Sequence, residues 1–86
     1  MNTTPDFDLM FLVAKRDMAE QDRNNLQRNL SRAKALSNRL NLLNAPAHER
    51  VRAKHMVKCL ENEVETAIDK LTSLRAEVLE LDWSQA

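Results

Sequence analysis

The second half of the chain contains a regular repeat of apolar residues. Two sets of them alternate at spacings of four and three, so that each set recurs every seven residues. The first set is Val57, Val64, Leu71 and Val78, and the second is Ala53, Leu60, Ala67, Leu74 and Leu81. Such spacing keeps one apolar stripe, or seam, facing a partner helix, as in coiled coils. The pattern predicts a helix over about residues 47–82 that packs along this seam against another helix.

The first half of the chain has apolar residues at similar spacings, among them Met18, Leu30, Leu36 and Leu40, but the pattern lapses over residues 20–25. Two interpretations remain open. In one, a helix over about residues 5–43 continues through the lapse and places polar side chains on its seam. In the other, Asn24–Asn25 forms a turn and the molecule has three helices. The continuous helix is favoured, because the chain has no glycine and no proline between Pro5 and Pro46.

Asn44, Ala45 and Pro46 form the clearest boundary in the sequence. Asparagine can adopt the left-handed conformation that ends a helix, and the residue before a proline is driven out of the helical region. Proline in turn suits the first position of a new helix. A turn at residues 44–46 is so short that the two helices, each about 50–60 Å long, must form an antiparallel hairpin.

The position of the turn predicts which residues face each other in the hairpin. We expect Leu60 opposite Leu30 and Leu81 near Met10, so that the polar stretch of the first helix faces Leu71. The middle of the seam then lacks apolar cover within one chain. The predicted fold is therefore all-α: residues 1–86 form a single domain, a long coiled-coil-like antiparallel hairpin that dimerises into a four-helix bundle.

The end of the hairpin away from the turn, the open end, is rich in apolar residues. All three aromatic residues are expected there, and residues 9–14 are apolar right round the helix, so one partner helix cannot cover them. These residues either plug the end of a small core or contact another chain, as exposed apolar patches usually do. We favour the contact. The predicted interface residues are Phe7, Met10, Phe11, Ala14, Ile68, Leu71, Leu79 and Trp83.

The 13 basic and 13 acidic residues cancel, but they are unevenly distributed. Residues 23–58 contain nine basic residues and one acidic residue, a net charge of +8. Residues 1–22 contain two basic and five acidic residues, a net charge of −3, and residues 59–86 contain two basic and seven acidic residues, a net charge of −5. The turn end is therefore predicted to be basic and the open end acidic. A basic face is often only solvated, but like charges one turn apart destabilise a helix and suggest an anionic partner. The residues predicted to contact an anion or nucleic acid are Arg28, Arg32, Arg39, Arg50, Arg52, Lys54 and Lys58.

The sequence offers little catalytic or metal-binding chemistry. Without glycine, a phosphate-binding loop is very unfavourable. His48, His55 and Cys59 share a helix face, but a structural zinc site needs four ligands and no fourth is evident. The single cysteine suits a reducing compartment, and no apolar run approaches the roughly 20 residues that span a bilayer. We expect no enzymatic activity, no cofactor, no metal and no membrane partner.

These observations predict a cytoplasmic, non-catalytic protein-protein interaction module, such as a small adaptor, chaperone, inhibitor or regulator. Its expected partners are a second copy of itself and another protein, either of which could be the chain that contacts the apolar open end. The alternative is a nucleic-acid-binding regulator that uses the basic turn end, since phosphate contacts require only well-placed lysine and arginine side chains.

Overall fold

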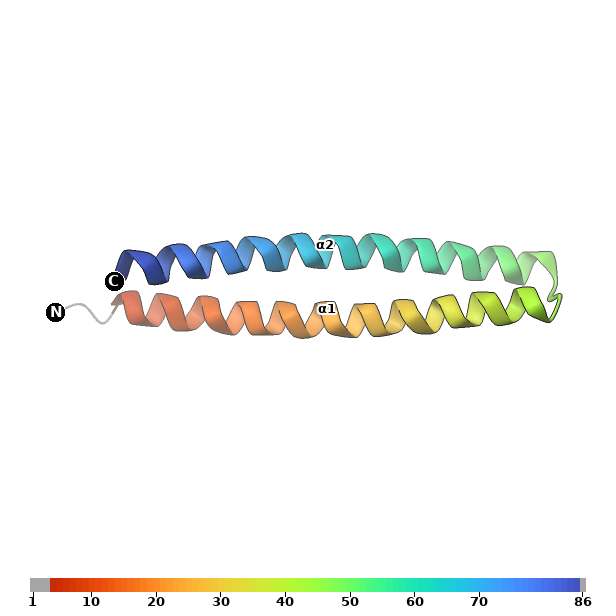
Figure 1. Cartoon of the computed structure of the whole chain (residues 1–86), viewed down its shortest axis with the longest axis horizontal. Helices are drawn as coiled ribbons and strands as arrows, with labels where there is room; N and C mark the ends of the chain where they lie inside the picture. Colours follow the sequence, from red (N-terminus) through yellow and green to blue (C-terminus); the bar gives the residue numbers. More distant parts are fainter. Residues whose placement is uncertain (1–3, 86) are drawn as a thin grey trace.

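The structure, a computed structural model that describes residues 4–85, consists of two long helices joined by a tight turn (Figure 1). Helix α1 spans Thr4–Leu42 and helix α2 spans Ala47–Gln85, each with 39 residues. The helices lie antiparallel in a molecule of 68 × 15 × 14 Å. The predicted all-α hairpin is confirmed. Helix α1 runs unbroken through Asn24 and Asn25, and α2 continues to Gln85 instead of ending near residue 82.

The turn has the backbone geometry that its sequence predicts. Asn44 adopts a left-handed conformation with a φ angle of 53°. The N–H of Ala45 donates to the carbonyl of Leu40 over 3.0 Å, and the N–H of Asn44 donates to the carbonyl of Asn41 over 3.2 Å. These two bonds form a Schellman motif, which satisfies carbonyl groups that the end of α1 would otherwise leave unpaired. The chain then enters α2 directly after Pro46.

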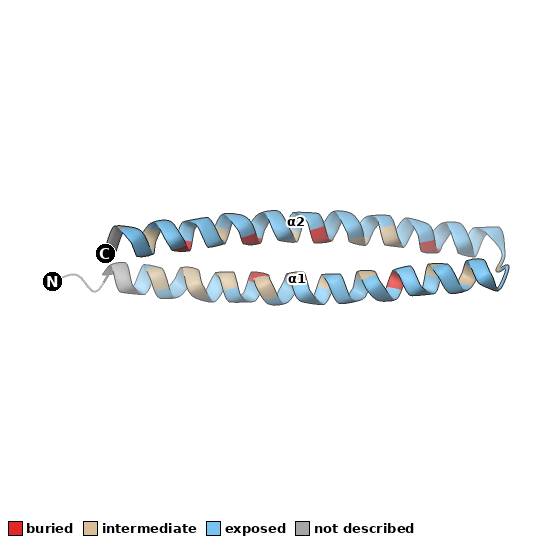
Figure 2. Ribbon diagram, viewed as in Figure 1, coloured by how far each residue is buried: buried red, intermediate tan, exposed pale blue. Residues whose placement is uncertain are grey.

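The core of the hairpin is the single seam between α1 and α2 (Figure 2). In α2 the seam positions are those of the apolar repeat. In α1 they also recur every seven residues, and three of the positions carry polar side chains that are half-buried. This outcome confirms the interpretation in which α1 continues through the polar lapse. The seam positions of α1 are Leu9, Leu12, Arg16, Ala19, Arg23, Leu26, Leu30, Ala33, Ser37 and Leu40.

The two helices pair two or three residues away from the expected register. Leu60 lines a groove with Ala33, and Leu81 lines another with Leu12. Met10, which was expected beside Leu81, is 68% exposed. The expectation for Met10 is wrong because the continuous apolar run at the start of α1 does not indicate which of its residues face inward.

Charged residues on both sides of the seam agree with the observed register. On one side, Nη2 of Arg75 in α2 donates to Oε1 of Glu20 in α1 over 3.1 Å. On the other side, Asp22 of α1 and Lys70 of α2 line one groove together. A partly exposed ion pair contributes only about 0–1 kcal/mol. Opposite charges across the helices therefore favour this register without supplying much of the stability.

The middle of the seam is well covered within one chain. Leu71 is only 1% exposed. The register places half-buried Arg23 opposite it, and an arginine stem can cover apolar surface while its guanidinium group reaches water. The Nη2 atom of Arg23 donates outward to Oδ1 of Asn24 over 2.9 Å. The expectation that a second chain must cover Leu71 is therefore wrong.

Candidate protein-interaction surface

The open end of the hairpin carries five large apolar side chains that the fold does not bury. On α1, Phe7 is 71% exposed, Met10 68% and Phe11 64%; on α2, Leu79 is 70% exposed and Trp83 83%. We call these five residues the open-end collar. A plug that closed a small core would bury its aromatic rings, so the plug interpretation is wrong for the single hairpin. The collar is apolar surface available to another chain.

The three aromatic residues share one end of the molecule but not one surface. Phe7 and Phe11 lie one turn apart on the outer side of α1. Trp83 follows the seam residue Leu81 by two positions, which turns it about 200° round α2 and away from α1. The Nζ atom of Lys15 lies 5.0 Å from the ring centroid of Phe11, a cation–π contact at the surface. The collar therefore surrounds the open end instead of forming one flat patch.

The remaining predicted interface residues differ in what they offer to a partner. Ala14 is exposed on α1, and Ile68 is 41% exposed on α2. Leu71 has no side-chain surface left, for the reason given above. Six further large apolar residues are exposed that the sequence did not indicate as interface residues. Met18 and Leu36 have spacings that also fit inward-facing positions, and the other four, which were not considered, are Leu42, Leu43, Val51 and Met56.

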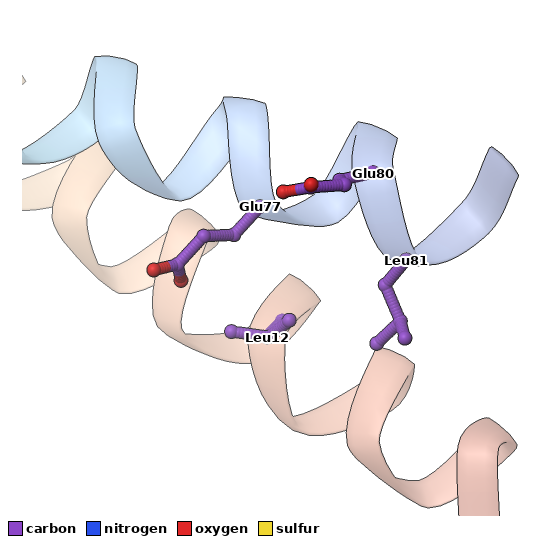
Figure 3. A pocket seen from close by; sticks show the side chains of 4 residues that line it. All are labelled: Leu12, Glu77, Glu80 and Leu81. Atoms are coloured by element: carbon purple, nitrogen blue, oxygen red, sulfur yellow. The ribbon is translucent and has the colours of Figure 1, made fainter. Parts of the chain in front are cut away.

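One side of the seam is open along the length of the molecule. Three shallow grooves lie there, and Figure 3 shows the one at the open end, where Leu12 and Leu81 lie beside the carboxylates of Glu77 and Glu80. The other two grooves share Glu63, which is two heptads before Glu77 and so follows the same side of α2. We call this side the grooved face. Its apolar residues are Leu12, Ala19, Leu26, Ala33, Leu36, Met56, Leu60, Ala67 and Leu81.

The opposite side of the seam is bordered mainly by polar side chains. Near the open end it carries the ion pair between Glu20 and Arg75, beside Arg16 and the exposed collar residue Leu79. Near the turn it carries Asn41 and Lys54, together with neighbouring polar residues and the exposed Val51. Covering this side would require the ion pair to lose its contact with water, which costs free energy.

The basic residues of the turn end are at the surface. All seven predicted anion-contacting residues are exposed. Within residues 4–85, the ion pairs join Arg16 to Asp17 and Arg75 to Glu20, and neither involves a basic residue between 23 and 58. Among the described residues, the positive charge of the turn end is therefore not neutralised by ion pairs.

His55 and Cys59 are the remaining reactive pair. The Nε2 atom of His55 lies 3.6 Å from Sγ of Cys59, one turn away on exposed α2 surface. In the part of the chain that the structure describes, no three histidine, cysteine, aspartate or glutamate side chains gather closely enough to hold a metal ion. This pair therefore forms no metal site with a third described side chain.

Neither helix, over residues 4–85, is sufficiently long and apolar to cross a membrane. Comparison of the chain with protein-family models, curated proteins and solved structures gave no match. Since a helical hairpin serves many functions, the function has to be argued from the collar, the grooved face and the charge distribution.

Proposed function

We propose that this chain is a non-catalytic protein-protein interaction module that works through the open-end collar and pairs with a second copy to form a four-helix bundle. The observation that carries the proposal is the exposure of the five collar side chains, 64–83% in the folded hairpin. Burying one such side chain stabilises a complex by roughly 1.5–3 kcal/mol. A role as a cytoplasmic adaptor, chaperone, inhibitor or regulator fits such a surface.

The small size of the core also supports association. Among the described residues, six apolar residues are buried, and three of these are alanines: Ala19, Ala33 and Ala53. Alanine buries little area, so one seam supplies only a few kcal/mol of stability. A second hairpin packed against the first would bury the half-exposed leucines that flank these alanines.

The Phe11→Asp substitution tests the proposal. We expect it to weaken self-association at least about tenfold, because it places a charge where an apolar contact forms. Light scattering over a range of protein concentrations measures the change in mass. Circular dichroism should show unchanged helix content, since Phe11 is 64% exposed and does not support the seam.

Asn38→Asp is the matched control, because it adds the same charge at an exposed position on α1, about 180° round the helix from Phe11, without removing an aromatic ring. It should leave the association unchanged. A wild-type chain that stays monomeric at the highest attainable concentration would contradict the homodimer, and equal effects of the two substitutions would contradict the role of the collar.

Nucleic-acid binding at the turn end is a second candidate function, favoured by the seven exposed basic residues, which have no ion-pair partners in the part of the chain that the structure describes. The Arg28→Glu, Arg32→Glu double variant should lose binding to a short RNA or DNA duplex at low salt, and wild-type binding should fall steeply with added salt. Fluorescence anisotropy measures both effects. The Lys15→Glu, Lys70→Glu variant, with the same change of charge outside the basic stretch of residues 23–58, should retain most of the binding. No binding by the wild-type chain at low salt would eliminate this candidate.

A further inference from the structure

The folded hairpin is strongly polarised along its long axis. In α1, residues 4–22 carry −3 and residues 23–42 carry +5; in α2, residues 47–58 carry +3 and residues 59–85 carry −5. Asp22 and Lys70 line one groove, so the charge boundary of α1 lies level with about residue 70 of α2, and the acidic residues 59–70 lie beside the basic half of α1. The turn half of the hairpin, residues 23–42 and 47–70, therefore carries +5, and the open half, residues 4–22 and 71–85, carries −5. The 68 Å length of the molecule far exceeds the screening length of about 8–10 Å in physiological salt. Each end therefore presents its own charge to a neighbouring molecule.

Two hairpins can stack face to face about a two-fold axis in two orientations. With both turns at the same end, the basic turn ends lie against each other and so do the acidic open ends. With the turns at opposite ends, each basic turn end covers an acidic open end. Complementary charge across an interface favours encounter and fixes orientation, whereas like charges oppose it. The charge distribution therefore selects the orientation with opposite turns.

The exposed apolar residues indicate which side of the hairpin packs against the second copy. On α1, Phe11 precedes Met18 by seven residues, and Met18 precedes Leu36 by about five complete turns, so the three follow one side of the helix. Leu36 lines a groove of that side with Met56. The grooved face thus has exposed apolar residues near both of its ends. With opposite turns, α1 lies against α1 of the second copy, and Phe11 and Met18 of each copy approach Leu36 of the other.

We propose that the occupant of the grooved face is the grooved face of a second copy, packed with the turns at opposite ends of a four-helix bundle. This inference rests on the homodimer of the proposed function and adds its face and orientation. Each acidic open end, including Phe11 of the collar, is covered by the basic turn end of the other copy. The polar side of the seam, with the ion pair of Glu20 and Arg75, stays in contact with water.

The distance between the two turns tests the orientation. The Leu43→Cys, Cys59→Ser variant carries one spin label per chain at the turn, and both substitutions are at exposed residues. Double electron–electron resonance should give a label distance on the order of 60 Å, because the turns lie at opposite ends of helices that rise about 1.5 Å per residue. A distance below roughly 30 Å in a confirmed dimer would overturn the orientation and leave the proposed function intact. A monomer would overturn the homodimer and this inference together.

A pair of charge reversals tests the face. Arg32 lines a groove of the grooved face, whereas Lys34 lies about 200° away round α1, and both are exposed in the same basic half. Arg32→Glu should raise the dissociation constant of the dimer about tenfold, and Lys34→Glu should raise it less than about threefold, when both are measured by sedimentation at low salt. Equal effects, or a larger effect of Lys34→Glu, would overturn the choice of face.

Discussion

Leu71→Ala is expected to lower the free energy of unfolding by about 2–5 kcal/mol. Leu71 is 1% exposed at the centre of the seam between α1 and α2, so its truncation loses apolar burial and leaves a cavity between the two helices. Urea denaturation followed by circular dichroism measures the loss. Wild type and variant must be compared at the same protein concentration, since association of folded chains adds to the apparent stability.

Leu42→Ala provides the control for this prediction. Leu42 is 85% exposed at the end of α1, so the same truncation there should change the free energy of unfolding by no more than about 0.5 kcal/mol. Similar losses for the two variants would show that stability does not depend on the seam as the structure has it.

Arg23→Leu is expected to raise the free energy of unfolding by about 1.5–2 kcal/mol. Arg23 is half-buried at a seam position of α1, where the register sets it opposite Leu71. Leucine at this position would add apolar area to the seam. Unlike arginine, it has no charged group that must extend out of the seam to reach water. The same denaturation experiment measures the gain.

The control for this gain is Arg28→Leu, an outward-facing and exposed position five residues further along α1. It should alter stability by about 0.5 kcal/mol or less. A lower free energy of unfolding for Arg23→Leu would show instead that contacts of the guanidinium group stabilise the packing of the two helices. Polar seam residues often fix register at a cost in stability, so the stabilised variant should also be checked for a second register.

The hairpin could be predicted from the sequence because its signals are strong and local. The seven-residue repeat from Ala53 to Leu81 leaves one inward face for α2, and Asn44 followed by Ala45 and Pro46 leaves one position for the turn. The inward face at the start of α1 could not be read locally, because residues 9–14 are all apolar. Steps of seven back from Leu26 reach Leu12, so the signal was present but lay across the polar lapse.

The candidate surface was predictable in part. The collar residues are exposed, as contact with another chain requires, because the wholly apolar start of α1 gives one partner helix more than it can cover. Leu71 was misassigned because the covering role of the half-buried Arg23 stem is not visible in a pattern of apolar and polar letters. Met18 and Leu36 have helical spacing that fits either side of α1, and only the register decided that they face outward.

Because the chain reverses at Asn44, contacts between the two helices differ in the length of chain that they enclose, and this difference sets the order in which they form. Seam contacts beside the turn close short loops, whereas contacts at the open end, such as that between Leu12 and Leu81, close almost the whole chain and cost more entropy. We therefore expect the seam contacts to form first beside the turn and last at the open end. Thermal fluctuations should separate the helices first at the open end. A partner bound to the collar would hold the two helices together at the end that separates most readily. Occupancy of the collar and the free energy of unfolding of the hairpin are therefore thermodynamically linked, so that a partner bound to the collar raises the stability of the whole fold.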